Sequence, residues 1–402
     1  MKRIAGGITA PAGFKATGVH CGLKKAGHPD LALIVSEPPA AGAGVFTTNQ
    51  VKAAPVLLDM EHLRKQKGTA AVLINSGNAN ACTGETGMRN ALASAQTVAE
   101  KLGLAPEEVL VASTGVIGVP LPLGKILKGI DAAIKSLAKE NGGMAAAAIM
   151  TTDLTLKEAA VELAIEGKKV VIGGMAKGSG MIHPNMATML AFVTSDAAVA
   201  KPVLQKAVES AVRKTFNCIT VDGDTSTNDT LLVLANGCAG NETIDAVDSP
   251  AYRQFYAGLE EVCRILAKAM AADGEGATKL IEIRVEGALD DEDARLIGRT
   301  VAVSKLVKTA VFGEDANWGR ILAAAGYSGC RTRVTDADIY LGDLQVCAAG
   351  GGIRFDEAKA KKILGRKEVV ITIRLKPGAG SSVIWTCDLT YDYIKINASY
   401  RS

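Results

Sequence analysis

Histidine and aromatic residues are scarce in this sequence, and each shortage excludes a class of function. Only four histidines occur in 402 residues, and no two are spaced as paired metal ligands, so we expect no histidine-rich metal centre. Tryptophan, tyrosine and phenylalanine make up 4% of the chain, which argues against stacking platforms for nucleic-acid bases. The 45 lysines and arginines nearly balance 42 aspartates and glutamates, so the charge predicts no nucleic-acid partner either.

The cysteine pattern and the lack of a long apolar run indicate the compartment. Eight cysteines are present without any C-x-x-C motif, which predicts free, buried thiols in a reducing cytoplasm. The start, residues 1–4, is basic and apolar like a signal peptide, but Gly6, Pro11 and Lys15 interrupt it. The longest run without Asp, Glu, Lys or Arg, residues 178–195, contains His183 and Pro184. We therefore expect a cytoplasmic protein without a membrane span.

Several nucleotide-binding and hydrolase motifs are absent despite 43 glycines. Residues 118–124 have five residues between their glycines, whereas a phosphate loop needs four before Gly-Lys-Ser/Thr. Gly178-Ser-Gly180 lacks the third glycine of a dinucleotide fingerprint. Residues 326–330 miss the final glycine of a nucleophile elbow. NTPases, nicotinamide enzymes and elbow-type serine hydrolases are not favoured.

Strand and helix signals alternate along the chain, which predicts a mixed α/β protein with helices packed on sheets. Short apolar runs predict buried strands at residues 71–75, 109–112, 169–172, 189–193 and 230–234. Alternating apolar and charged residues predict half-exposed strands at 280–285 and 369–375, and 383–396 is expected to form one or two more. Helices are predicted over 88–102 and 123–139, from Pro202, and from Pro250 with Ser249 as its N-cap.

One segment, residues 177–193, combines features that suggest chemistry. A glycine-rich loop with Lys177 precedes Pro184-Asn185, which favours a turn, and Thr188 stands directly before a predicted buried strand. A threonine in such a place can attack its own preceding carbonyl, and hydrolysis of the ester frees an α-amine. That amine, with a pKa of about 7.7–8.0, can activate the hydroxyl without any histidine. The same pattern also suits a threonine that simply opens a strand.

Residues 175–188 resemble the self-cleavage segment of the ornithine acetyltransferase family, the bifunctional glutamate N-acetyltransferases of arginine biosynthesis. Further matching blocks follow in order along nearly the whole chain: residues 43–49, 75–80, 113–118, 151–153, 222–229, 315–320 and 397–402. The resemblance implies an α/β fold with sheets sandwiched by helices and an N-terminal-nucleophile-type site. It also implies cleavage between Ala187 and Thr188 into an α chain, 1–187, and a β chain, 188–402, assembled as an α2β2 heterotetramer.

The resemblance further implies a ping-pong transfer of acetyl from N2-acetyl-L-ornithine to L-glutamate, with Thr188 as nucleophile. Thr114 and Gly115 match the family's oxyanion hole. The substrate-binding positions that match are Thr151, Lys177, Thr188, Glu275, Asn397 and Ser402, where many members have threonine instead of Ser402. No cofactor or metal is implied, and acetyl-CoA is a possible second acetyl donor.

Plain structural interpretations exist for the same residues. Residues 114–115 could form an ordinary strand-end turn, Thr151 could be an N-cap, Lys177 could lie on the surface, and Glu275 could occupy a polar turn. Asp222, Asp224 and Asp229 lack EF-hand spacing and are read as loop hydrogen-bonders, and Cys218 and Trp318 as packing residues. Two other functions stay open: a self-processed amidase or aminopeptidase, and a non-catalytic amino-acid-binding protein.

Overall fold

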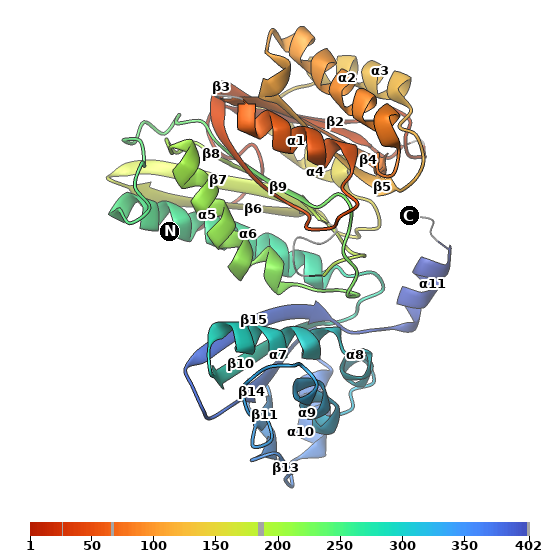
Figure 1. The fold of residues 1–402 in the computed structure, drawn as a ribbon, viewed down its shortest axis with the longest axis vertical. Coiled ribbons are helices and arrows are strands. Elements are labelled where there is room, and N and C mark those ends of the chain that lie inside the picture. The colour runs from red at the N-terminus through yellow and green to blue at the C-terminus, as the bar shows by residue number, and fades with distance from the viewer. Residues whose placement is uncertain (26, 66–67, 184–188, 400–402) are drawn as a thin grey trace.

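A nine-stranded and a six-stranded sheet organise the computed structural model, which describes residues 1–25, 27–65, 68–183 and 189–399 (Figure 1). The helices are α1 (Ala54–Lys65), α2 (Gly84–Leu102), α3 (Leu123–Lys135), α4 (Gly142–Ile149), α5 (Lys201–Lys214), α6 (Pro250–Ala272), α7 (Asp291–Val303), α8 (Lys305–Phe312), α9 (Trp318–Gly326), α10 (Glu357–Leu364) and α11 (Tyr391–Ser399). The strands are β1 (Lys2–Ile4), β2 (Phe14–Val19), β3 (Leu31–Phe46), β4 (Thr69–Asn78), β5 (Val109–Val116), β6 (Lys157–Ile165), β7 (Lys168–Lys177), β8 (Leu190–Ser195), β9 (Thr230–Ala235), β10 (Leu280–Ala288), β11 (Asp338–Leu341), β12 (Leu344–Ala348), β13 (Gly351–Gly352), β14 (Glu368–Arg374) and β15 (Gly380–Cys387).

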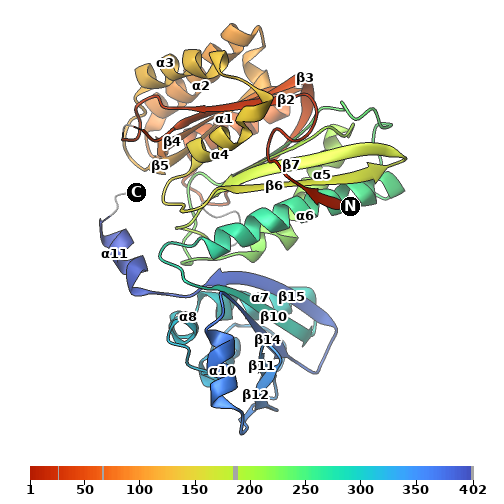
Figure 2. The same cartoon turned by 180° about the vertical axis from the view of Figure 1, so that it is seen from behind.

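The larger sheet is folded onto itself by its longest strand. The first part of β3 pairs with β2 and β4, and its second part, from Ala41, pairs with β9. The two halves of the sheet therefore face each other across a core that includes Phe14, Ile34, Phe192 and Leu232, all at most 2% exposed. Helices α1–α3 cover the outer face of one half and α5 and α6 that of the other (Figures 1 and 2). These layers confirm the predicted sheets sandwiched by helices.

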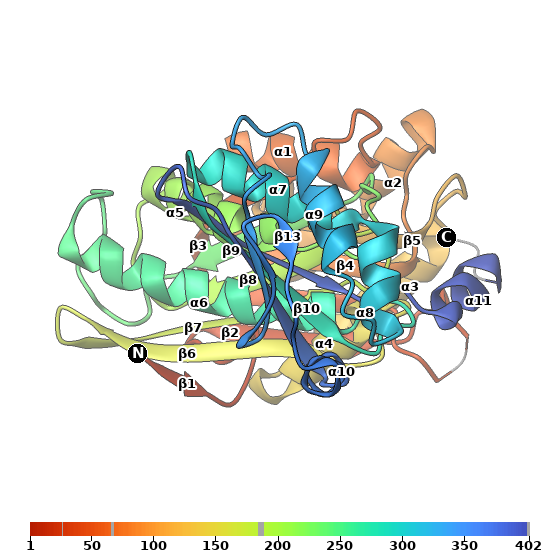
Figure 3. The same ribbon diagram turned by 90° about the horizontal axis from the view of Figure 1, so that it is seen from below.

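The second sheet has the order β13-β12-β11-β14-β10-β15 and lies beside α6, below the layered part of the molecule (Figures 1 and 3). Its core is continuous with that of the larger unit, because Leu266 of α6 and Ile283 of β10 belong to one buried cluster. Burial alternates along β10, where Ile281, Ile283 and Val285 are fully buried while Arg284 is exposed. This alternation confirms the half-exposed strand predicted there.

Two predicted elements differ in the structure. The helix expected over 123–139 ends at Lys135, because Ala138 instead exchanges backbone hydrogen bonds with Ala16. The strands expected over 383–396 are wrong in their second half, since β15 stops at Cys387 and α11 follows. The Thr390 hydroxyl accepts hydrogen bonds from the backbone N–H groups of Asp392 and Tyr393 and so starts that helix.

Other sequence predictions are confirmed. Ser249 caps α6 by accepting a hydrogen bond from the Tyr252 N–H at 3.0 Å, and all eight cysteines are free thiols. Cys218 is buried, as expected of a packing residue, but the expectation is wrong for Cys82 and Cys238, whose side chains are exposed. Within the described ranges, no helix has both the length and the apolar character that crossing a bilayer requires.

The core between the two halves of the larger sheet should contribute strongly to stability. Replacing Phe192, which is fully buried there, by alanine is expected to lower the free energy of unfolding by about 3–5 kcal/mol through lost burial and a residual cavity. The control Leu154→Ala, at a side chain 80% exposed, should change it by less than about 0.5 kcal/mol. Denaturant unfolding checks both values, and equal midpoints for the two variants would contradict this packing.

Candidate active site

A cavity of about 120 Å³ opens where loops from both halves of the larger sheet meet α11. Its lining consists of Ala79, Thr114, Gly115, Ile117, Thr151, Thr152, Lys177, Gly180, Met181, Asp222, Asp224, Ser226, Asn228, Glu275, Tyr393 and Asn397. Six residues singled out in the sequence are thus neighbours in one pocket, although they come from positions 114 to 397. The other three, Ala187, Thr188 and Ser402, lie outside the described residues.

The end of β5 presents Thr114 and Gly115 to the cavity. Gly115 has φ +133°, and a Cβ there would approach the carbonyl carbon of Gly77 in β4 to 2.4 Å, so only glycine fits this register. The Asn228 side-chain amide donates to the carbonyls of Ala79 and Ser113 at 2.6 and 2.8 Å. These bonds hold the ends of β4 and β5 in place, which fixes Thr114 at the cavity wall.

Lys177 supplies a buried cation at the end of β7. Its side chain is 3% exposed overall, and Nζ lies 3.4 Å from the Thr114 hydroxyl oxygen, to which it donates. Burial lowers the pKa of Lys177, while the carboxylates of Asp153 and Glu275 oppose that shift. The lysine is therefore not the surface residue that one interpretation of the sequence allowed.

Glu275 supplies a buried carboxylate to the same cavity. It lies just beyond the C-terminal end of α6. Its backbone N–H donates to the Ser179 carbonyl at 2.8 Å, and the Asn397 side-chain amide donates to its Oε2, also at 2.8 Å. A Cβ on Gly180 would come within 2.4 Å of the Glu275 carboxylate. Glycine at 180 therefore gives this carboxylate its room.

The loop over residues 222–229 anchors the chain on both sides of residues 184–188. Asp222 accepts hydrogen bonds from the N–H groups of Met181 and Ile182 at 2.5 and 2.9 Å, and Asp229 accepts one from Met189 at 2.8 Å. Burial raises the pKa of both carboxyl groups, that of Asp229 well above its usual range. The prediction that Asp222 and Asp229 are loop hydrogen-bonders is confirmed.

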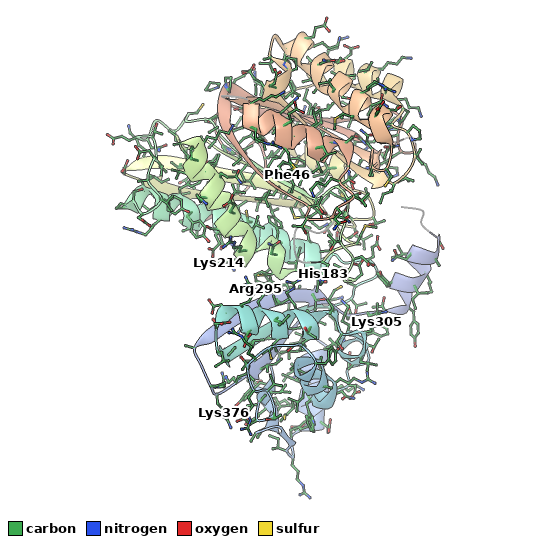
Figure 4. All side chains as sticks on the ribbon, in the orientation of Figure 1. Phe46, His183, Lys214, Arg295, Lys305 and Lys376 are labelled. Carbon is green, nitrogen blue, oxygen red and sulfur yellow. The ribbon has the colours of Figure 1, made fainter. Side chains whose placement is uncertain are left out.

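His183 lies at the junction with the second sheet (Figure 4), where it meets Arg299 of α7. Its Nδ1 is 3.3 Å from the Thr220 hydroxyl and its Nε2 is 3.4 Å from an Arg299 guanidinium nitrogen. Burial, together with the Arg299 charge, lowers its pKa to about 4. His183 is therefore neutral at pH 7.

Comparisons with known proteins give one consistent result. A family model described as the ArgJ family matches residues 15–402. The arginine biosynthesis bifunctional protein ArgJ of Symbiobacterium thermophilum is 57% identical, with 100% of both chains covered. The chain belongs to the ArgJ family.

Two solved structures of relatives are similar to this chain in sequence. The crystal structure of the arginine biosynthesis bifunctional protein ArgJ from Bacillus halodurans is 46% identical, covers 52% of this chain and 97% of that chain, and has a TM-score of 0.50. That of an ornithine acetyltransferase complexed with ornithine, from Mycobacterium tuberculosis, is 44% identical and covers 46% of this chain and 96% of that chain, with a TM-score of 0.42. This chain is an acetyltransferase of arginine biosynthesis.

Sequence reasoning did not single out several lining residues of this ArgJ pocket. Thr152 and Asn228 lie inside sequence blocks that carry the family resemblance, but the sequence suggested no role for either residue. The Thr152 hydroxyl is 2.6 Å from that of Ser179. Tyr393 was assigned to a strand, and only the helical turn of α11 brings it to the pocket. Among the described residues, no group of three or more His, Cys, Asp or Glu side chains is placed to hold a metal ion.

The space at Gly180 gives a direct test of the pocket. Gly180→Ala should displace the Glu275 carboxylate, since the new Cβ would lie 2.4 Å from it, and should lower acetyltransferase kcat/KM by about tenfold or more. Gly124→Ala, where nothing lies within 4 Å of the added Cβ, is the matched control and should match the wild type. Steady-state kinetics of the two variants distinguishes them, and an unaffected Gly180→Ala enzyme would remove Glu275 from the site.

Proposed function

We propose that this enzyme transfers the acetyl group of N2-acetyl-L-ornithine to L-glutamate by a ping-pong reaction through acetyl-Thr188. The observation that supports this best is the composition of the pocket. A buried cation, Lys177, a buried carboxylate, Glu275, and the Thr114–Gly115 pair surround one cavity. Such a set suits an acylated amino acid that carries charges of both signs. Met189 is hydrogen-bonded to Asp229, the neighbour in sequence of the lining residue Asn228.

Self-cleavage between Ala187 and Thr188 prepares the nucleophile in this proposal. The Thr188 hydroxyl attacks the Ala187 carbonyl carbon, and the amide bond between Ala187 and Thr188 is replaced by an ester to the Thr188 Oγ. Water then hydrolyses this ester and leaves a free Thr188 α-amine. The anchors on Met181, Ile182 and Met189 support a defined geometry on both sides of the scissile bond. The Bacillus halodurans structure matches over 97% of its own chain but over only 52% of this one. A chain of about half this length is consistent with separate chains 1–187 and 188–402.

Acetyl transfer then uses the same hydroxyl. The Thr188 α-amine takes the proton of the Thr188 hydroxyl, and Oγ attacks the acetyl carbonyl carbon. The oxyanion of the resulting tetrahedral intermediate accepts hydrogen bonds from the Thr114 hydroxyl and the Gly115 N–H. The C–N bond breaks as the α-ammonium returns its proton to the leaving amine of ornithine. The α-amine of L-glutamate attacks acetyl-Thr188 in the second half, which releases N-acetyl-L-glutamate and restores the enzyme.

Substrate binding follows from the charges around the pocket. Thr151 and Lys177 bind the α-carboxylate that donor and acceptor share, because a desolvated ammonium group strongly favours an anion. Glu275 binds the side-chain ammonium of ornithine, assisted by Asn397 and Ser402. No cofactor or metal takes part, and acetyl-CoA serves as an additional donor for glutamate, which an assay with acetyl-CoA and glutamate alone tests.

Assembly and location complete the proposal. The two chains of each protomer form an α2β2 heterotetramer, and the enzyme works in the cytoplasm, where its eight free thiols stay reduced. Two alternatives predict other products. An amidase or aminopeptidase with the same nucleophile would release acetate to water, and an amino-acid-binding protein would bind its ligand without turnover.

Thr188→Ala should abolish both cleavage and acetyl transfer, because it removes the only atom that forms either covalent intermediate. Thr188→Ser keeps a hydroxyl and should retain both activities. A denaturing gel with intact-mass measurement should find one chain for the alanine variant and pieces 1–187 and 188–402 for the serine variant and the wild type. Acetyl transfer by Thr188→Ala would sink the proposed mechanism.

Removing the hydroxyl of Thr114 and removing that of Thr151, both in the pocket lining, should have separable effects. Thr114→Val is expected to lower kcat by about 100- to 1,000-fold, as loss of one oxyanion donor does elsewhere, with little change in KM. Thr151→Val should mainly raise KM, because Thr151 contacts the carboxylate rather than the reacting carbonyl. Initial rates over a range of concentrations of both substrates give kcat and KM for each variant. A higher KM for Thr114→Val together with a lower kcat for Thr151→Val would exchange the assigned roles.

A further inference from the structure

Lys157 is a charged residue in an apolar position. It begins β6 on the face where Ala159, Val161, Leu163 and Ile165 are buried, and its own side chain is completely inaccessible. A lysine on the inward face of a strand is costly unless anions surround it. Two do so, since Nζ donates to Asp153 Oδ1 at 2.7 Å and to Asp273 Oδ2 at 2.5 Å. These three residues are called the ion cluster below.

Asp273 is itself in an unfavourable place without Lys157. It is the C-cap of α6, a helix of 23 residues with no basic residue in its last turn, so the helix dipole disfavours a carboxylate there. Besides Lys157, its Oδ2 accepts the N–H groups of Leu154 and Thr155 at 3.0 and 3.3 Å. Asp273 thus joins the end of α6, which leads to Glu275, to the loop that contains Thr151.

Asp153 connects the same loop to the lysine of the pocket. Its Oδ2 accepts the Thr151 N–H at 3.0 Å, and its Oδ1 accepts the Gly178 N–H at 2.7 Å. Burial disfavours the Asp153 charge, but Lys177 and Lys157 outweigh it and hold the pKa of this carboxyl at about 2. In Figure 2 the start of β6, the end of β7 and the C-terminal end of α6 lie on the same side of the molecule.

We propose that the ion cluster is a positioning device that holds Thr151 and Lys177 in their substrate-binding arrangement, separately from the groups that react. The proposal rests on the proposed function, in which those two residues bind the α-carboxylate. The carboxylates of the ion cluster accept hydrogen bonds from backbone N–H groups of residues 151–155, the loop that contains Thr151, and of Gly178, the residue after Lys177. Removing one member should therefore loosen binding of the carboxylate.

The reacting groups are held mainly by other contacts, although Lys177 Nζ also donates to the Thr114 hydroxyl at 3.4 Å. Asn228 fixes the strand ends beside Thr114, and Asp229 holds the Met189 N–H. Neither contact involves Asp153, Lys157 or Asp273. A buried ion pair is also weak evidence for stability, because desolvation offsets most of its attraction. The effect of the cluster should consequently be seen in KM rather than in kcat.

Asp273→Asn is the first test, because it keeps the size of the side chain and leaves Asp153 to pair with Lys157. We expect KM for both N2-acetyl-L-ornithine and L-glutamate to rise about tenfold, as a small misplacement of binding groups would cause, with kcat within about twofold of the wild type. The dissociation constant of ornithine, measured by calorimetry on the purified enzyme, should rise by the same factor.

Asp131→Asn is the matched control. Asp131 pairs with Lys101 at 2.6 Å, but both side chains are exposed, so neither KM nor kcat should change. If Asp273→Asn behaves like this control, or loses kcat while both KM values stay constant, as a smaller folded fraction would cause, the positioning role is refuted.

A second variant guards against misfolding. The double change Lys157→Met with Asp273→Asn removes one charge of each sign and leaves no unpaired cation, and it should raise KM at least as much as Asp273→Asn. Failure of the proposed function would look different, since the wild-type enzyme would then transfer no acetyl group to glutamate. Ornithine binding would still report on the ion cluster, because that measurement needs no turnover.

Discussion

The register of β8 is the constraint on which the whole pocket depends. Leu190 is paired with Lys177 of β7 on one side and with Thr230 of β9 on the other. That pairing brings the end of the glycine-rich loop, the chain just after residue 188 and the 222–229 loop to one edge of the sheet. A shift of β8 by one residue would turn its own side chains to the opposite faces of the sheet, and would also part Met189 from Asp229. Backbone hydrogen bonds and the fully buried side chains of β8 hold this register.

The second strand pair contributes the other wall of the pocket through a different requirement. Gly77 and Gly115 are opposite each other in β4 and β5, and a side chain at Gly115 would collide with the facing backbone. The long strand β3 connects this half of the sheet to β9, so the two walls belong to one hydrogen-bonded system. The position of Thr114 relative to Lys177 is thus determined by the fold rather than by a flexible loop.

Charge placed in the interior sets the chemical character of the site. Lys157, Lys177, Asp153 and Glu275 are all largely buried, and each would be destabilising alone. Together they form a balanced set of two basic and two acidic side chains with little water around them. An interior of this kind strengthens attraction to a ligand that carries charges of both signs.

Much of the fold could be predicted from the sequence. Short apolar runs, caps such as Ser249 and the alternation in β10 are local signals, because burial on one face imposes a period of two or 3.6 residues. Candidate site residues were also accessible in advance, through blocks that resemble one family. Local patterns failed at residues 391–399, where an alternating sequence forms α11 because Thr390 caps a helix and no strand pairs with it.

By itself, then, the sequence determined the α/β class, most elements, the family and the residue types available for chemistry, because those depend on composition and short spacings. Only the tertiary structure decided that residues 114, 177, 275 and 397 share one cavity, that Lys177 is buried, and that Asp153, Lys157 and Asp273 meet. These facts depend on strand register and on contacts between segments far apart in the sequence, and no local pattern encodes either.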